Sequence, residues 1–154
     1  MAEAAVKRIA ALLAIAFVSG CGGLKAKTMS YGTLAEARTA GAIDKGWVPA
    51  DLPESVFELR VAYVPEGWQR WGIINFLPTA ADGVRALLQT EELPLRGMRC
   101  DIPGRIEWWP VLLREKLDAE RIGATGARAY RSRQGNMVFV VNWTQGRAYY
   151  WTTG

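Results

Sequence analysis

The chain of 154 residues contains no histidine and only two cysteines. Histidine is the most common general base near neutral pH and the most common protein ligand of zinc. Its absence excludes serine–histidine–aspartate and cysteine–histidine catalytic arrangements and the usual zinc-binding spacings. Two cysteines are too few for a disulfide framework. We therefore expect a protein that is not an enzyme and that carries no metal and no cofactor.

The sequence also has no glycine-rich phosphate loop, no internal repeat and no low-complexity tract. Its net charge is +4, and the basic residues are spread along the chain rather than gathered in one block. Such a mild excess does not favour binding to nucleic acid. Nucleic acid is therefore not expected as a partner.

The first twenty residues have the pattern of an export signal. Lys7 and Arg8 precede an uncharged run over residues 9–18, which is followed by small residues. As a helix the run would span about 15 Å, half of the roughly 30 Å hydrocarbon core of a bilayer, so a retained transmembrane anchor is the weaker alternative. Residues 18–21, Val-Ser-Gly-Cys, resemble the bacterial lipobox. We expect cleavage between Gly20 and Cys21 and a lipid on Cys21.

Cleavage at this site would divide the chain into a signal peptide (residues 1–20), a tether (21–30) and a single domain (31–154), which we predict to be α+β. The tether reaches at most about 35 Å when fully extended, so the domain must lie close to its membrane. We expect a protein anchored to the cell membrane or outer membrane through the lipid on Cys21. Its domain would face the periplasm or the exterior.

The domain begins with a well-marked short helix, predicted over residues 34–40. Thr33 and Glu36 form a capping-box pattern, in which the Thr33 hydroxyl accepts from the Glu36 amide and the Glu36 carboxylate accepts from the Thr33 amide. Gly41 provides a left-handed C-terminal cap, and Ile43 is expected to fold back onto the helix.

Residues 31–60 resemble the N-terminal part of YbbD head domain proteins, which are small bacterial lipoproteins without an assigned activity. The matching positions are Tyr31, Thr33, Glu36, Ala37, Gly41, Ile43, Gly46, Trp47, Val48, Pro49, Leu52, Pro53, Ser55, Leu59 and Arg60. Weaker similarity follows at residues 108–110 and 149–151. The resemblance implies a lipoprotein and implies no catalytic residue.

The rest of the sequence predicts strands and helices in alternation. Period-two patterns predict a hairpin over residues 58–64 and 68–77, and a meander over 127–133, 137–143 and 147–151. Residues 137–141 are all apolar, which predicts a central strand. Helices are expected over residues 79–89 and from Pro110 to about Gly123, with an irregular loop over 91–107. The predicted fold class is α+β, with about five antiparallel strands and two or three short helices.

Aromatic residues are the best candidates for a ligand surface. Trp108 and Trp109 could bind a glycan through their flat faces or pack in the core, and core packing is favoured for Trp47. Cys100 is either a small buried residue or a thiol activated by Arg99. A basic group on adjoining strands could contact anionic lipid or simply be solvated: Arg128, Arg131, Arg133 and Arg147.

Three functions follow from these observations. The first is a lipid-anchored envelope protein whose domain binds a protein or another envelope component without catalysing a reaction. The second is a binder of glycan or peptidoglycan that uses Trp108 and Trp109. The third and weakest is a hydrolase with paired carboxylates, for which Glu54 with Glu58, or Asp101 with Glu107, are candidates.

Overall fold

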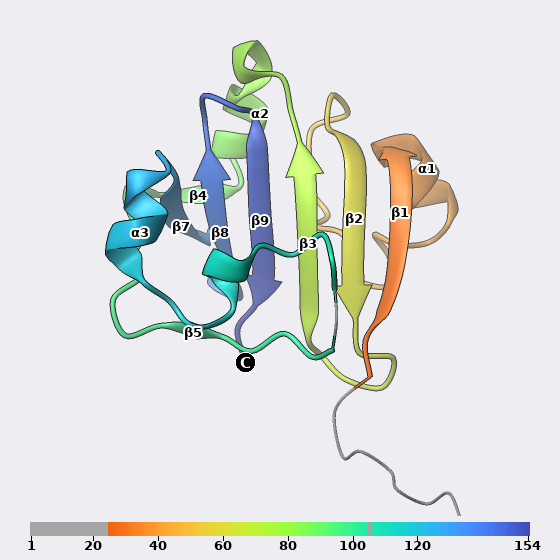
Figure 1. Cartoon of the computed structure of the whole chain (residues 1–154). Coiled ribbons are helices and arrows are strands. Elements are labelled where there is room, and N and C mark those ends of the chain that lie inside the picture. The colour runs from red at the N-terminus through yellow and green to blue at the C-terminus, as the bar shows by residue number, and fades with distance from the viewer. Residues whose placement is uncertain (1–24, 105) are drawn as a thin grey trace, which may run out of the picture.

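The computed structural model describes residues 25–104 and 106–154, so the predicted signal peptide and Cys21 lie outside the described residues. Seven strands form one antiparallel sheet in the order β1-β2-β3-β9-β8-β7-β4 (Figure 1). These strands are β1 (Lys27–Thr33), β2 (Phe57–Tyr63), β3 (Arg70–Asn75), β4 (Leu88–Glu92), β7 (Arg128–Ser132), β8 (Met137–Asn142) and β9 (Arg147–Thr152). A two-stranded sheet pairs β5 (Arg99–Cys100) with β6 (Glu115–Lys116).

The helices are short. They are α1 (Leu34–Thr39), α2 (Asp82–Arg85) and α3 (Ala119–Ala124), with 3₁₀ turns η2 (Pro78–Ala80) and η3 (Val111–Leu113). None of the helices in the described ranges has the length and apolar character needed to cross a membrane. The predicted α+β class with about five strands is therefore wrong, because the described chain is mostly β and its main sheet has seven strands.

Two predicted helices are shorter than expected because the chain changes conformation within them. The helix predicted over residues 79–89 ends at Arg85, and Leu88 already pairs with Ser132 as part of β4. The helix predicted from Pro110 is divided, since Glu115 has a positive φ of 56° that is incompatible with a continuous helix. Asp118 then caps the separate helix α3.

The first strand lies in the predicted tether. Residues 27–30 belong to β1, where Lys27 pairs with Tyr63 and Ser30 with Arg60. In this edge strand only Tyr31 is buried, so its side chains have no apolar alternation. Backbone pairing with β2, rather than side-chain burial, places residues 27–30 in the sheet.

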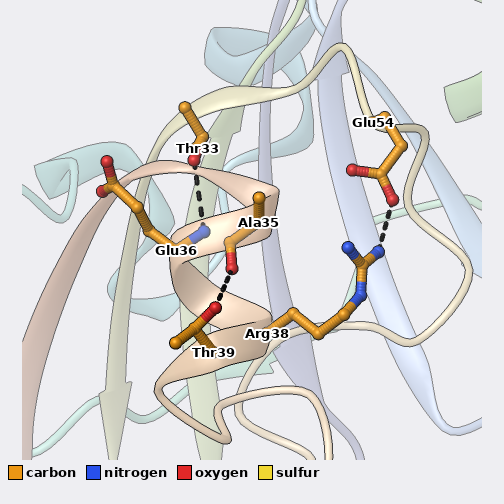
Figure 2. A network of polar contacts seen from close by, with 6 residues as sticks. All are labelled: Thr33, Ala35, Glu36, Arg38, Thr39 and Glu54. Atoms are coloured by element: carbon orange, nitrogen blue, oxygen red, sulfur yellow. Dashed lines mark hydrogen bonds and ion pairs between the residues drawn. The ribbon is translucent and has the colours of Figure 1, made fainter.

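Helix α1 has the predicted N-terminal cap with one change (Figure 2). The Glu36 amide donates to the Thr33 hydroxyl at 3.2 Å. The Glu36 carboxylate accepts from the amide of Gly32 at 2.8 Å rather than from that of Thr33. Both bonds satisfy backbone donors at the start of the helix.

At its other end α1 closes with a Schellman motif. Gly41 has a φ of 79°, its amide donates to the Arg38 carbonyl at 3.0 Å, and the Ala42 amide donates to the Ala37 carbonyl at 2.9 Å. Ala42 and Ala37 are both fully buried, whereas Ile43 is half-buried. Ala42 belongs to the same core cluster as Leu34 and Ala37, and Ile43 packs against that cluster from outside.

Two layers cover the sheet. The first layer consists of α1, residues 40–56 and α2, and it packs on side chains that include Leu59, Ile74, Phe139 and Tyr150. The second layer is formed by residues 93–127, and it packs on Trp71, Val138, Val140 and Trp151. In Figure 1 part of this second layer crosses in front of β9 and β3. Because the sheet is covered on both faces, residues 137–141 of β8 are all apolar, and β8 lies inside the sheet between β9 and β7 as predicted.

Candidate functional site

A groove lies on the second face of the sheet, beside the segment of residues 101–113. It consists of two adjoining cavities of about 260 and 280 Å³ that share Arg147 and Tyr149. The smaller cavity is also lined by Glu58, Arg60, Ile73, Asn75 and Trp108. The larger is lined by Pro110, Leu112, Leu113, Ile122, Thr125, Ala127, Val140, Asn142 and Gln145. We refer to these two cavities together as the groove.

The polar part of the groove is held by a chain of hydrogen bonds. Arg147 Nε donates to Asn75 Oδ1 at 3.0 Å, and Asn75 Nδ2 donates to the Glu58 carbonyl at 3.1 Å. Asn75 is only 9% exposed, so its amide orientation is fixed by these partners. The bond to Asn75 uses one of the five donors of the Arg147 guanidinium, and the terminal nitrogens remain available as donors. This geometry presents an oriented cation at the centre of the groove.

Backbone strain occurs at the same place. Glu58 has a positive φ of 47°, which is unfavourable for a residue with a side chain. The pairing register between β2 and β3 shifts between Phe57 and Arg60. Such a bulge redirects the side chains around it, and strained residues of this kind cluster at functional sites. Here the bulge brings Glu58 and Arg60 to the wall of the groove.

The two candidate tryptophans have different positions. Trp109 is 2% exposed, and its indole nitrogen donates to the Leu113 carbonyl at 2.8 Å. Its ring meets those of Trp108, Tyr149 and Trp151 edge-on, with centroids 5.6 to 6.2 Å apart. Trp109 is thus a core residue, whereas Trp108 is half-buried and lines the groove.

The larger cavity is mainly apolar. Leu112 and Ala127 are half-buried, and Val140 forms part of the floor provided by β8. Asn142 and Gln145 add polar groups at its edge. The groove therefore combines an aromatic and charged part with an apolar part. This combination suits a ligand that has both polar groups and apolar faces.

Neither of the carboxylate pairs considered for hydrolysis has both members among the described residues that line the groove. Glu54 forms an ion pair with Arg38, and Asp101 pairs with Arg99 at 2.9 Å. Glu58 is the one acidic residue among the described residues that line the groove. The described residues also contain no group of three or more potential metal ligands among cysteine, aspartate and glutamate.

The predicted basic group is divided between the two faces of the sheet. Side chains alternate along β7, so Arg128 shares the first face with the core residue Tyr130, and Arg131 shares the second face with Ala129. Arg128 contacts Glu92 at 3.4 Å. Arg147 alone among the four lines the groove.

Two further candidates are structural. Cys100 is 1% exposed, and burial raises the pKa of its thiol to about 12, so the reactive thiolate is disfavoured at neutral pH. The ring of Trp47 stacks on that of Tyr63 with centroids 3.8 Å apart. The Trp47 carbonyl accepts a hydrogen bond of 2.8 Å from the buried Tyr150 hydroxyl. These contacts place both residues in the packing of the domain.

Sequence reasoning missed most of the groove. It named Trp108, Arg147 and Glu58 as candidates, but it gave no binding role to Arg60, Asn75 or Tyr149. Arg60 and Tyr149 each lie between two buried residues of their strands. The period-two pattern therefore predicts that their side chains face solvent. Asn75 carried a weak signal, since an amide within an apolar run needs hydrogen-bond partners when it is buried.

Comparison with known families identifies one region of the chain. No curated protein and no solved structure matches it. The matched region contains β1, α1, the connecting residues 40–56 and β2, and it stops in the loop before β3. Residues 26–68 match the model of the YbbD head domain, which confirms the resemblance predicted from residues 31–60.

Proposed function

We propose that this protein is a lipid-anchored component of the bacterial envelope whose domain binds a ligand in the groove and catalyses no reaction. Two observations support the location. Residues 18–21 have the lipobox pattern, and residues 26–68 match the YbbD head domain. The lipid would be attached to Cys21 and would hold the domain at the cell membrane or outer membrane.

The position of the groove supports a ligand away from the anchoring membrane. β1 begins at Lys27, which pairs with the last residue of β2, Tyr63. The polar cavity lies at the opposite end of the same strands, where Glu58, Asn75 and Arg147 are located. A strand of six residues spans about 20 Å. A ligand in the groove would thus be an envelope component within reach of a short tether.

One observation carries the proposal of binding rather than hydrolysis. The polar cavity has aromatic side chains, Trp108 and Tyr149, beside the oriented guanidinium of Arg147, with a single carboxylate at its wall. Paired-carboxylate hydrolysis requires a second carboxyl group about 5 to 10 Å from the first. Aromatic faces with hydrogen-bond donors are the usual means of binding without reaction.

The anchor is tested by metabolic labelling with radioactive palmitate. We expect label on the wild-type protein and none on Cys21→Ala, with the wild type in the membrane fraction. A wild-type protein that takes up no label would contradict the proposal of a lipoprotein.

The groove is tested by crosslinking in intact envelopes. We expect Arg147→Ala and Trp108→Ala to lose the crosslinked partner, because both side chains line the polar cavity. Met29→Ala is the control, since Met29 is 41% exposed and lies in the edge strand β1, none of whose described residues lines the groove. Equal crosslinking of all three variants would exclude the groove as the binding surface.

Glycan or peptidoglycan is the second candidate ligand, and the pairing of Trp108 and Tyr149 in one cavity favours it. Flat aromatic faces stack on sugar rings, and arginine and asparagine side chains donate to or accept from hydroxyl groups. Retention of the purified protein on isolated sacculi tests this candidate. We expect Trp108→Ala to be retained less than the wild type, and equal retention would count against it.

A further inference from the structure

The loop between β2 and β3 lies at the end of the sheet where the chain enters the domain. Lys27 of β1 pairs with Tyr63, and the loop of residues 64–69 follows directly (Figure 1). The loop exposes Trp68, whose side chain is 56% accessible. We call residues 64–69 the Trp68 loop. A tryptophan side chain combines a large apolar ring with a polar N–H group, which suits a boundary that is apolar on one side and wet on the other.

The Trp68 loop is held rigidly from within. Nη1 of Arg70 donates to the carbonyls of Gly67 at 2.8 Å and Gln69 at 2.9 Å, and it lies 3.4 Å from that of Val64. The carbonyl of Trp68 accepts from the Thr152 hydroxyl at 3.3 Å. Several backbone acceptors of the loop are therefore already satisfied inside the protein. Such a loop can approach an apolar environment without leaving these groups unpaired.

The Trp68 indole is also supported from behind. A Cβ atom added to Gly154 would lie 2.8 Å from the indole ring, so the end of the chain packs closely against it. One side of the ring is thus covered by Gly154, and the residue as a whole stays 56% exposed. The charged residues nearby are mixed, with the exposed Lys25 and Lys27 on the entering chain and the exposed Glu66 in the loop.

We propose that the Trp68 loop contacts the surface of the phospholipid bilayer in which the protein is anchored. This inference rests on the proposed lipid at Cys21. Five residues, 22–26, separate Cys21 from β1, and they reach at most about 18 Å when extended. The loop at this end of the sheet is therefore within reach of the headgroup region, where tryptophan side chains are enriched. Lys25 and Lys27 add attraction to anionic headgroups.

Bilayer contact serves to orient the domain. A single point of attachment leaves the sheet free to tilt, whereas a second contact at Trp68 fixes its long direction relative to the membrane. The groove lies at the other end of the strands, so this contact would direct the groove away from the bilayer and toward the envelope.

The lipidated full-length protein, reconstituted in vesicles of phosphatidylethanolamine and phosphatidylglycerol, provides the test. Tryptophan fluorescence is compared in ordinary vesicles and in vesicles whose acyl chains carry bromine near the headgroup. We expect bromine to quench part of the wild-type emission. This quenching should be lost in Trp68→Phe and kept in the matched control Trp108→Phe, because Trp108 lies in the groove.

Palmitate on Cys21 is measured in the same samples, which separates the two proposals. Lipidated protein whose quenching is equal in wild type and Trp68→Phe overturns the bilayer contact and leaves the lipid anchor intact. Protein that carries no lipid overturns the proposed anchor. Quenching that is stronger with bromine at the chain ends than near the headgroup would overturn a surface contact.

Discussion

The two layers that cover the sheet are built in different ways. The first layer contains α1, which has a side-chain cap at one end and a Schellman motif at the other. The second layer has short elements separated by irregular chain, and it is organised around the buried ring of Trp109. The difference shows that a sheet face can be covered by a capped helix or by an irregular segment centred on one large side chain.

The irregular layer is also the one beside which the groove forms. Residues 93–127 cover part of the second face, and the ends of β2, β3 and β9 line the polar cavity next to Trp108. The groove thus lies where regular packing ends, because chain that follows no repeating pattern leaves space between itself and the sheet. If the two layers differ in this way, substitutions within them should change the stability of the domain by different amounts.

The largest effect is expected from Trp109→Ala. This change removes the ring that contacts Trp108, Tyr149 and Trp151, and it should lower the free energy of unfolding by about 3 to 5 kcal/mol. Urea unfolding measures the loss. Leu34→Ala in the first layer is the matched control, since Leu34 is fully buried in α1 and should cost about 2 to 5 kcal/mol. If Trp109→Ala lost less than about 1 kcal/mol while Leu34→Ala lost its expected amount, the second layer would not depend on this one ring.

Alkaline pH should destabilise the second layer through Cys100. Its pKa rises from 9.0 to about 12 on folding because the thiol is buried. The stabilising contribution of the neutral thiol is fully present below pH 9 and is lost as the pH rises toward 12. The total loss is on the order of 4 kcal/mol, at the usual equivalence of pKa shift and free energy.

Urea unfolding over this pH range should show a shallower decline for Cys100→Ala than for the wild type. Part of the decline should remain, because burial also raises the pKa of Tyr150 above 10.0. Identical slopes for the two proteins would show that Cys100 opens to solvent before global unfolding.

Gly72→Ala tests how the sheet itself supports the first layer. Gly72 pairs with Tyr150, and an added Cβ would lie 2.1 Å from the Tyr150 ring. The ring must move and strain its hydrogen bond to the Trp47 carbonyl. We expect a loss of about 1 to 3 kcal/mol in thermal or urea unfolding. Gly123→Ala is the control, because nothing lies within 4 Å of its added Cβ. Equal stability of the two variants would contradict the described packing.

Thr33→Ala removes the N-terminal cap of α1. The Glu36 amide loses its acceptor, and the expected cost is about 1 kcal/mol. Thr33→Ser keeps a hydroxyl and should restore most of the loss in the same unfolding measurement. A Thr33→Ser variant as unstable as Thr33→Ala would show that the methyl group, not the hydrogen bond, matters.

The smallest effect is expected from Arg38→Ala. Arg38 pairs with Glu54 on the surface of the first layer, and both side chains are more than half exposed (Figure 2). Solvent screens such pairs, so the unfolding midpoint should not change measurably. A clear loss of stability would show that α1 is stabilised by this ion pair as well as by its caps and its buried face.

The sequence predicted those parts of the molecule that local patterns encode. The predictions of the capped helix at residues 34–40, of the strand at 58–64 and of the three strands within 127–151 were correct. Apolar alternation and capping residues depend on only a few neighbouring positions. The edge strands β1 and β4 were not predicted, since they are stabilised by backbone pairing with residues distant in sequence. Apolar spacing over residues 109–117 indicated a helix, yet the side chains of Trp109, Leu113 and Leu117 reach the same core from an irregular backbone.

The groove was harder to predict than the fold. Its polar part depends on a register shift in β2 and on bonds between β2, β3 and β9, which join residues 58, 75 and 147. No local pattern reports such long-range pairing. The aromatic residues were visible as a pair, but only the fold distinguishes Trp108 at the groove from Trp109 in the core.

The position of the last strand, β9, determines the order in which the strands of the main sheet can pair. β9 lies between β3 and β8, so residues 147–152 join the N-terminal part of the sheet to the C-terminal part. Before these residues are available, β3 and β8 both present an unpaired edge, and the pairings that close the sheet are distant in sequence. The sheet can therefore be completed only after synthesis has passed residue 152, and until then its N-terminal and C-terminal parts remain separate.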